Sequence, residues 1–272
     1  MARRSVVMPN IGEAAILQAP SPSSSCIEFD SVAKVFEAHG LRTEALRDVT
    51  FSVGQNEFMS IIGPSGCGKT TVLRIIADLV QPSTGSVQVL GGPPRIARQR
   101  RAIGFVFQEA TLLAWRTVLD NILLPYEIAG KKPDRHRAME LLELVGLSGF
   151  QTHYPDELSG GMQQRVAIAR ALAIDPEILL MDEPFGALDL ITRDKMGLEL
   201  LRIWERTKKT VVFVTHSVQE AVLLSDKVVV MSLRPGKIIH AVPIDLPRPR
   251  AVTMRDTDRF HEMAISLRRL LE

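Results

Sequence analysis

A glycine-rich loop that follows a short apolar run is the feature that most constrains the fold of this chain. The apolar run extends from Phe58 to Ile62. The loop after it has the P-loop spacing G-x-x-x-x-G-K-T and consists of Gly63, Pro64, Ser65, Gly66, Cys67, Gly68, Lys69 and Thr70. Apolar residues then recur at helical intervals from Thr70 to Leu79. A strand, a glycine loop and a helix in this order predict a site where backbone N–H groups and a helix N-terminus surround nucleotide phosphates.

The last residues of the loop carry most of its chemistry. Lys69 would place a point charge on the phosphates, Thr70 would offer its hydroxyl to Mg²⁺, and Thr71 belongs to the same nucleotide-binding segment. The alternative is a glycine turn with a solvated lysine, which would be credible if no other motif accompanied it. Cys67 lies near a helix N-terminus, which tends to lower a thiol pKa, so we expect thiol reagents to block nucleotide binding. We expect no catalytic role for Cys67.

Two adjacent carboxylates follow a second apolar strand. Residues Ile178 to Met181 form the strand, and Asp182 and Glu183 come directly after it. Because ligands of α/β sheets bind at the carboxyl ends of strands, we expect both carboxylates near the phosphates. Asp182 suits Mg²⁺ through its water shell, and Glu183 is placed to accept a proton from an attacking water. The alternative role for this pair is helix capping.

Strand-like and helical segments alternate along the chain. This alternation is typical of α/β proteins with a parallel sheet. Between about Thr117 and Ala173 the pattern is helical, which predicts an α-helical insertion. The expected strands are Ile27–Phe36, Leu46–Val53, Phe58–Ile62, Ile178–Met181, Val211–Thr215 and Lys227–Met231, and further helices are expected at Leu190–Arg206, Val218–Leu224 and Asp258–Leu271.

The two ends of the chain differ from its middle. Residues 1–24 lead into a Pro- and Ser-rich run that cannot bury enough apolar area to offset the entropy of ordering, so we predict a disordered tail there. Its apolar stretches are too interrupted for a signal peptide. We predict a catalytic domain over residues 25–250, with a helical subdomain at about 110–175, and a C-terminal amphipathic helix over residues 251–272.

Composition narrows the class of protein. The formal charge is +2, from 33 basic and 31 acidic residues, so no strong global field favours nucleic acid or acidic lipid. The two cysteines, Cys26 and Cys67, lack the spacing of a zinc site or a disulfide framework, which favours a reducing cytosol. No window approaches the roughly 20 consecutive apolar residues that span a bilayer, so we expect membrane association only through a partner.

A third motif gives the chain a family resemblance. It is the run LSGGMQQR, made up of Leu158, Ser159, Gly160, Gly161, Met162, Gln163, Gln164 and Arg165, and it resembles the signature sequence of ATP-binding cassette (ABC) proteins. The resemblance covers about Ile27 to Arg250. Gln108 resembles the Q-loop glutamine, Ala187-Leu188-Asp189 the D-loop and His216 the switch histidine, in the order of the family. The resemblance implies an α/β P-loop NTPase fold with a mixed or parallel core sheet, an antiparallel β subdomain and an α-helical subdomain.

The resemblance also implies a role for each matched residue. Phe36 aligns with the aromatic residue that stacks on adenine, although tyrosine is more usual there and a core phenylalanine is the alternative. Gln108 would sense Mg²⁺ and the attacking water, and His216, which in isolation would more often be structural, would contact the γ-phosphate. Asp189 would cross a dimer interface. Ser159, Gly160 and Gly161, at a second helix N-terminus, would bind the γ-phosphate of ATP held by another subunit. The implied assembly is a dimer of ATPase subunits, most simply a homodimer, closed around two MgATP.

Further runs point to a transport role. The region from Phe105 to Asn121 resembles the part of importer ATPases that receives a coupling helix from the membrane subunit, with Trp115 and Arg116 beside the groove; packing at a helix start is the alternative. The runs Glu183–Asp189, Met231–Gly236 and Leu246–Arg250 resemble nitrate, sulfonate and taurine importer ATPases. The implied partners are integral membrane permease subunits and, indirectly, an extracytoplasmic solute-binding protein. The ATPase would be peripheral, on the cytoplasmic face of the cell membrane. The cargo stays open, because closely similar ATPases serve bicarbonate, cyanate, pyrimidine and riboflavin-like compounds.

Three other functions compete with the importer interpretation. An exporter or lipoprotein-release ATPase would share the catalytic residues and differ in the coupling region. A DNA-acting cassette ATPase typically has long coiled-coil or zinc-bearing inserts before the signature run, and neither heptads nor Cys and His clusters occur there, so we expect no nucleic-acid partner. A non-hydrolysing scaffold would lack the lysine, the base or the switch residue, yet Lys69, Glu183 and His216 are all present.

Basic residues near the end of the sequence leave two interpretations open. They would face anionic lipid headgroups in one, and form a solvated face in the other. The residues concerned include Arg234, Arg248, Arg250, Arg268 and Arg269.

Overall fold

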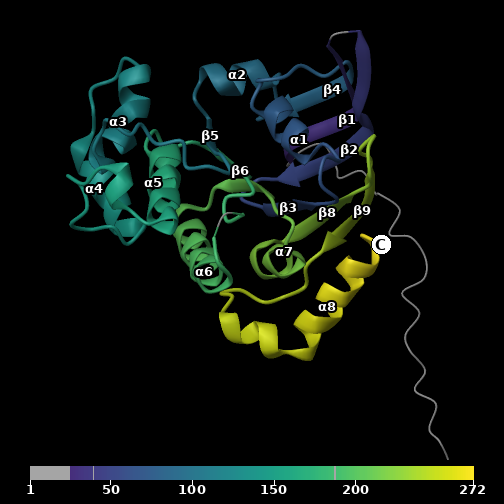
Figure 1. Ribbon diagram of the computed structural model, residues 1–272. Helices are drawn as coiled ribbons and strands as arrows, with labels where there is room; N and C mark the ends of the chain where they lie inside the picture. Colours follow the sequence, from purple (N-terminus) through teal and green to yellow (C-terminus); the bar gives the residue numbers. More distant parts are fainter. Residues whose placement is uncertain (1–24, 39, 187) are drawn as a thin grey trace, which may run out of the picture.

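The computed structural model describes residues 25–38, 40–186 and 188–272 and folds them into two β-sheets with helices around them (Figure 1). The predicted N-terminal tail, residues 1–24, lies outside the described residues. One sheet is antiparallel with strand order β2-β1-β4, and the other has the order β5-β6-β7-β3-β8-β9 and is parallel except at its last strand. The predicted α/β fold with a largely parallel core sheet and a separate antiparallel sheet is confirmed.

The six-stranded sheet has its most buried strands in the middle. Strands β3, β6 and β7 are buried along their whole length, which requires cover on both faces. Strand β3 pairs with β7 on one side and with β8 on the other. The strand that leads into the glycine loop is therefore central. The six strands are β5 (Ile103–Val106), β6 (Ile178–Asp182), β7 (Thr210–Val214), β3 (Phe58–Ile62), β8 (Lys227–Met231) and β9 (Ile238–Pro243).

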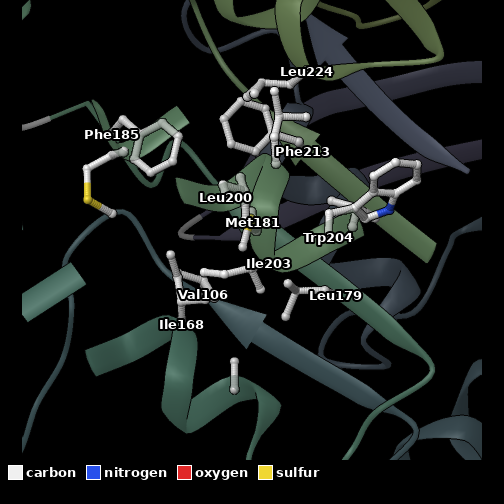
Figure 2. Packing of buried hydrophobic residues seen from close by; sticks show 14 of the residues in the cluster. Val106, Ile168, Leu179, Met181, Phe185, Leu200, Ile203, Trp204, Phe213 and Leu224 are labelled. Atoms are coloured by element: carbon white, nitrogen blue, oxygen red, sulfur yellow. The ribbon is translucent and has the colours of Figure 1, made fainter. Parts of the chain in front are cut away.

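Successive side chains of the central strands enter two different cores. In β7, Val211 and Phe213 belong to one core, which also contains helical residues from α3 to α8, whereas Val212 and Val214 belong to the other, with α1 and the antiparallel sheet. Figure 2 shows part of the first core, where the ring centroids of Phe185 and Phe213 are 5.7 Å apart. A shift of one residue in register would exchange the two sets, so the two cores fix the register.

The antiparallel sheet contains one strand that the sequence pattern did not predict. Its strands are β1 (Ser25–Ala38), β2 (Leu41–Gly54) and β4 (Thr84–Val89), followed by helix α2 (Pro94–Gln99). Strand β4 is mostly exposed and has few apolar residues. Strand β9, also not predicted, lies at the sheet edge with no fully buried residue. Pairing with distant strands, rather than local periodicity, defines such strands.

The helical insertion begins each of its α-helices with a side-chain cap. Thr117, Asp134 and Ser159 accept hydrogen bonds from backbone N–H groups in the first turns. Such caps satisfy N–H groups that have no partner inside the helix. In Figure 1 the insertion lies on the side of the molecule away from β9. Its elements are α3 (Val118–Ile128), α4 (Arg135–Leu144), the short η1 (Pro155–Glu157) and α5 (Gly160–Leu172).

The last helices cover one face of the six-stranded sheet (Figure 1). They are α6 (Leu190–Thr207), α7 (Val218–Leu224), the short η2 (Val252–Asp256) and α8 (Asp258–Arg269). Phe260 and Leu267 of α8 are buried in the first core. Among the described residues, no helix combines the length and the hydropathy that crossing a bilayer requires.

The arginines near the end of the sequence do not form one lipid-facing surface. The Arg250 side chain is 1% exposed, and its Nη1 donates to three backbone carbonyls at the end of α7. Burial lowers its pKa to about 10. Arg248 lies 4.0 Å from the Trp204 ring centroid and pairs with Asp226 at 2.7 Å. The lipid-facing interpretation is therefore wrong for these two residues, because each stabilises the fold instead.

Candidate active site

The glycine-rich loop connects β3 to α1 (Lys69–Ile76) at the carboxyl edge of the parallel sheet. Helices α3 to α8 all begin with a side-chain N-cap. Helix α1 instead begins after Gly68, at φ 108°, with no side-chain cap and no acidic residue in its first turn. The first N–H groups of α1 therefore remain available to a ligand, and together with the helix dipole they favour an anion.

Glycines allow the loop to lie directly against its neighbours. A Cβ on Gly68 would lie 2.6 Å from the Leu46 Cδ2, so no larger residue fits there without displacement. The Lys69 side chain turns back over the loop, where its Nζ donates to Gly63 O at 2.9 Å and to Pro64 O at 3.0 Å. The loop thus fixes a buried ammonium group beside the free helix end.

A pocket of about 270 Å³ opens beside the loop. Phe36 at its rim is 40% exposed, and Lys34 Nζ lies 4.9 Å from the centroid of its ring, so this residue is not a core phenylalanine. Three lining residues, Thr43, Ala45 and Arg234, were not among the predicted site residues. The predicted site residues that line the pocket are Phe36, Ser65, Gly66, Gly68, Lys69, Thr70, Thr71, Glu183 and His216.

Thr70 and Asp182 form a hydrogen-bonded pair of oxygen-bearing side chains next to this pocket. The Thr70 hydroxyl donates to Asp182 Oδ1 at 3.0 Å. Burial raises the pKa of the Asp182 carboxyl, against a smaller lowering effect of the Thr70 hydrogen bond. A desolvated carboxylate beside a hydroxyl fits a hard divalent cation. Within the described ranges, no three or more His, Cys, Asp or Glu side chains gather as a metal cluster.

Glu183 has an unusual backbone conformation. Its φ of 48° lies in the left-handed region, which costs a residue other than glycine about 1–3 kcal/mol. Two backbone hydrogen bonds hold it, from Glu183 N to Val214 O and from Gly186 N to Glu183 O, both 3.0 Å. Its carboxylate is 14% exposed and lies 2.6 Å from His216 Nε2. Asp189, not Asp182 or Glu183, caps the next helix, α6, so the helix-capping alternative for the acidic pair is wrong.

Gln108 lies next to the acidic pair but does not line the pocket. Its side chain is exposed, and its Nε2 lies 3.5 Å from the position that a Cβ on Gly186 would occupy. That position is 3.3 Å from Glu183 O. The structure therefore brings the predicted Q-loop glutamine to the turn that follows Glu183.

The signature run and Asp189 lie outside the lining of this pocket. Ser159 and Gly160 are exposed at the start of α5, and a Cβ on Gly161 would lie 3.0 Å from Thr192 Cγ2 of α6. Asp189 accepts a hydrogen bond from Thr192 N at 3.0 Å, and hydrogen bonds from Thr192 hold the pKa of the Asp189 carboxyl below its usual range. Ala187, of the same predicted D-loop, lies outside the described residues. The chain thus packs the D-loop region against its own signature run.

The expectation for the Cys67 thiol is wrong. Cys67 is fully buried, and burial raises its thiol pKa, while the nearby Lys69 lowers it to a smaller extent. The side chain points into the core shared by α1 and the antiparallel sheet. Desolvation therefore outweighs the helix N-terminus, and the thiol is neither acidic nor accessible.

The lining residues that sequence reasoning missed come from two segments without a catalytic motif. Thr43 and Ala45 lie on β2, and only the packing of the antiparallel sheet against the loop brings them to the pocket. Arg234 lies between β8 and β9, in the run Met231–Gly236. We interpreted that run as a marker of a subfamily. The sequence therefore singled out the run that contains Arg234, but it did not show that this residue lies at the pocket.

The loop follows the central strand of a largely parallel sheet, and the Thr70–Asp182 pair lies at the same carboxyl edge of that sheet. These features define the P-loop nucleoside triphosphatase class. Within that class, the family model described as ABC transporter matches residues 46–186. An uncharacterized ABC transporter ATP-binding protein of Methanocaldococcus jannaschii is 53% identical over 82% of this chain and 84% of its own length. The chain belongs to the ABC transporter family, and it is an ATP-binding, ATP-hydrolysing subunit.

Two relatives carry names that specify a transport process. The aliphatic sulfonates import ATP-binding protein SsuB of Bacillus cereus is 44% identical over 87% of this chain and 92% of its own length. The nitrate import ATP-binding protein NrtD of Synechococcus elongatus is 43% identical over 88% of this chain and 89% of its own length.

Solved structures agree with the family. The dimeric structure of MJ0796, described as a bacterial ABC transporter cassette, superposes with a TM-score of 0.71 at 36% identity, covering 81% of this chain and all of that chain. The same cassette in a post-hydrolysis state bound to ADP and Pi gives a TM-score of 0.69 at 35% identity with the same coverage.

Proposed function

We propose that this chain energises the import of a small solute, with nitrate, a sulfonate such as taurine, or a related compound as the cargo. The relatives named for aliphatic sulfonate import and nitrate import match most of this chain and most of their own length. They favour the importer over an exporter or a lipoprotein-release ATPase. Because the ATPase subunit has no contact with the cargo, the choice of cargo rests on these relatives.

ATP would occupy the pocket beside the loop, with its base at Phe36. The exposed Phe36 ring offers a stacking face, while the free N–H groups of α1 and the Lys69 ammonium would bind the phosphates. Thr70 and Asp182 would hold Mg²⁺, with Gln108 as a further ligand. Bound Mg²⁺ supplies charge neutralisation at the phosphates.

We assign Glu183 the role of general base. Its carboxylate lines the pocket near Lys69 and would accept a proton from a water that attacks the γ-phosphorus, while the bond from that phosphorus to the leaving ADP oxygen breaks. Such a base is worth about 10²–10⁴-fold in rate. His216, 2.6 Å away, would orient the carboxylate and contact the γ-phosphate. The strained backbone of Glu183 keeps the carboxylate at this edge of the pocket.

A second copy of the chain would complete each site. The signature residues Ser159, Gly160 and Gly161 lie at a helix N-terminus outside the pocket of their own chain, so they are free to bind the γ-phosphate in a partner's pocket. Asp189 would cross the same interface. The dimeric structure of a cassette of the same family supports an assembly of two subunits. Loss of the γ-phosphate would remove the contacts that keep the dimer closed.

The segment between β5 and α3 would transmit closure to the permease subunits. Gln164 donates to Phe107 O, and Arg170 donates to the carbonyls of Ala110 and Thr111, so α5 holds this segment. Trp115, within it, is 74% exposed. An exposed aromatic on a braced segment suits docking of a helix from a membrane subunit. The chain would then act as a peripheral protein on the cytoplasmic face of the membrane, and a solute-binding protein would contact the permease on the far side.

The observation that carries the proposed mechanism is the 2.6 Å contact between Glu183 and His216 beside the uncapped α1. We would test it with Glu183→Gln, which should keep MgATP binding and lower ATP turnover by about 10²–10⁴-fold. Size-exclusion chromatography with light scattering should then show a stable dimer only for the variant with MgATP. A variant that hydrolyses ATP like wild type would contradict the base assignment.

The importer proposal needs a separate test in the assembled transporter. The chain, purified together with its permease subunits and reconstituted in proteoliposomes, should support ATP-dependent accumulation of labelled taurine or nitrate when a solute-binding protein is supplied. ATP-driven movement in the opposite direction would instead support the exporter alternative.

A further inference from the structure

The loop between β8 and β9, residues Ser232 to Lys237, packs directly on the phosphate-binding loop. A Cβ on Gly236 would lie 2.0 Å from Cys67 O, so the two backbones are in close contact. Gly236 N donates to Ala45 O at 2.9 Å, and Gly236 O accepts from Arg47 N at 3.0 Å. The loop is therefore attached both to the P-loop and to β2.

Hydrogen bonds within this loop fix its shape. Ser232 N donates to Lys237 O at 2.9 Å, and the Ser232 hydroxyl accepts from Lys237 N at 3.0 Å and donates to Pro235 O at 3.2 Å. A loop closed on itself in this way presents its exposed residues at fixed positions. Arg234 is exposed at the tip of this loop, so the fixed backbone holds its side chain at a defined position next to the P-loop.

Arg234 reaches the wall of the nucleotide pocket. It lines the pocket together with Ser65 and Gly66, and its Nε donates to Gly66 O at 3.2 Å. Its Nη2 lies 3.4 Å from the position that a Cβ on Gly66 would occupy. In the part of the chain that the structure describes, no carboxylate lies within ion-pair distance of Arg234. One edge of the guanidinium is thus bound to the loop, while the remaining donors have no acidic partner.

We propose that Arg234 is a nucleotide-binding residue that donates hydrogen bonds to the phosphate oxygens of the ATP held by the P-loop. It acts as a second cation beside Lys69 in the lining of the same pocket. The planar fork of arginine suits this position, because it can keep the contact with Gly66 O and still bind an oxyanion. The inference rests on the proposed function, since it assigns one more contact to the same ATP. The competing interpretation is that Arg234 only braces the loop through Gly66 O.

The test compares charge with bracing. Arg234→Gln removes the charge but keeps an N–H donor, Arg234→Lys keeps the charge without the fork, and Lys237→Gln removes an exposed cation of the same loop that does not line the pocket. Lys69→Ala serves as the variant that loses a phosphate contact of the P-loop itself. MgATP affinity would be measured by titration calorimetry at two salt concentrations, with the melting temperature of each variant as a check on folding.

We expect Arg234→Gln to weaken MgATP binding about 10-fold to 100-fold, with a smaller dependence on salt than wild type because one charge contact is lost. The MgATP affinity of Arg234→Lys should lie between those of wild type and Arg234→Gln, and the affinity of Lys237→Gln should match that of wild type. Equal affinity of wild type and Arg234→Gln would overturn the proposal, and so would a loss of affinity with unchanged salt dependence, which is the result expected of a brace. If wild type bound no MgATP, the proposed function itself would fail. If Lys69→Ala lost MgATP affinity while the Arg234 variants kept it, only the role of Arg234 would be rejected.

Discussion

The contact between Gly236 and the P-loop leads to a quantitative prediction for Gly236→Ala. The added Cβ would lie 2.0 Å from Cys67 O and 2.8 Å from Met231 Cε, whereas real Cβ atoms essentially never approach another heavy atom within 3.0 Å. The methionine end can move aside, but Cys67 O is backbone. Two backbone segments must therefore separate by about 1 Å, a displacement that can cost roughly 100-fold in turnover when it misplaces a catalytic group.

The same substitution should also lower stability. Overpacking of this kind typically costs about 1–3 kcal/mol, and in a chain of this size each kcal/mol lowers the melting temperature by about 2–4 °C. We would measure melting by calorimetry and turnover by phosphate release. Gly92→Ala is the matched control, since its added Cβ would meet only Ile96 Cδ1, at 3.6 Å. Wild-type melting and turnover in Gly236→Ala would refute the close contact between the two loops.

Two further predictions concern buried groups. Arg250→Met should destabilise the protein by about 3 kcal/mol or more, because it leaves three carbonyls at the end of α7 without this donor, and each unsatisfied buried group costs about 1–3 kcal/mol. Equilibrium unfolding in urea measures this loss. In the control variant Arg268→Met, which replaces an exposed arginine, stability should change by less than about 0.5 kcal/mol. Burial raises the thiol pKa of both Cys26 and Cys67, so at pH 8 a smaller fraction of these thiols is ionised in the folded protein than in the unfolded chain. The folded protein should therefore react with iodoacetamide far more slowly than glutathione does, whereas the unfolded chain should react at the glutathione rate. Rapid alkylation of Cys67 in the folded protein would contradict its burial.

Strands that are buried on both faces were predictable from the sequence. β3 and β8 have the predicted bounds, β6 extends one residue beyond its predicted end, and β7 begins and ends one residue earlier than predicted. These strands could be predicted because cover on both faces leaves a continuous apolar run. Strands β4 and β9 gave no such signal. Four of the six residues of β4 are exposed and β9 lies at an edge, so the pairing of these strands depends on β1 and β8 rather than on their own pattern.

The residues of the site also differ in whether the sequence could predict them. The loop, Asp182 and Glu183 follow from motifs, since their chemistry requires particular residue types at a fixed spacing. Arg234 and Thr43 could not be placed, because packing between segments far apart in the chain brings them to the pocket. Cys67 shows the limit of local reasoning. The helix N-terminus is visible in the sequence, but the core that surrounds the thiol is not.

The central position of β3 has a consequence for the order in which the protein is made. Both neighbours of β3 in the sheet, β7 and β8, come from beyond Lys209, so this strand has no partner until most of the chain has left the ribosome. The intervening residues, about 150 in number, take roughly 7–30 s to synthesise at about 5–20 residues per second. During that time the strand that carries the phosphate-binding loop is an unpaired apolar segment. The nascent chain therefore acquires its ATP site late, and a chaperone that covers β3 in this interval would protect it from aggregation without competing with nucleotide.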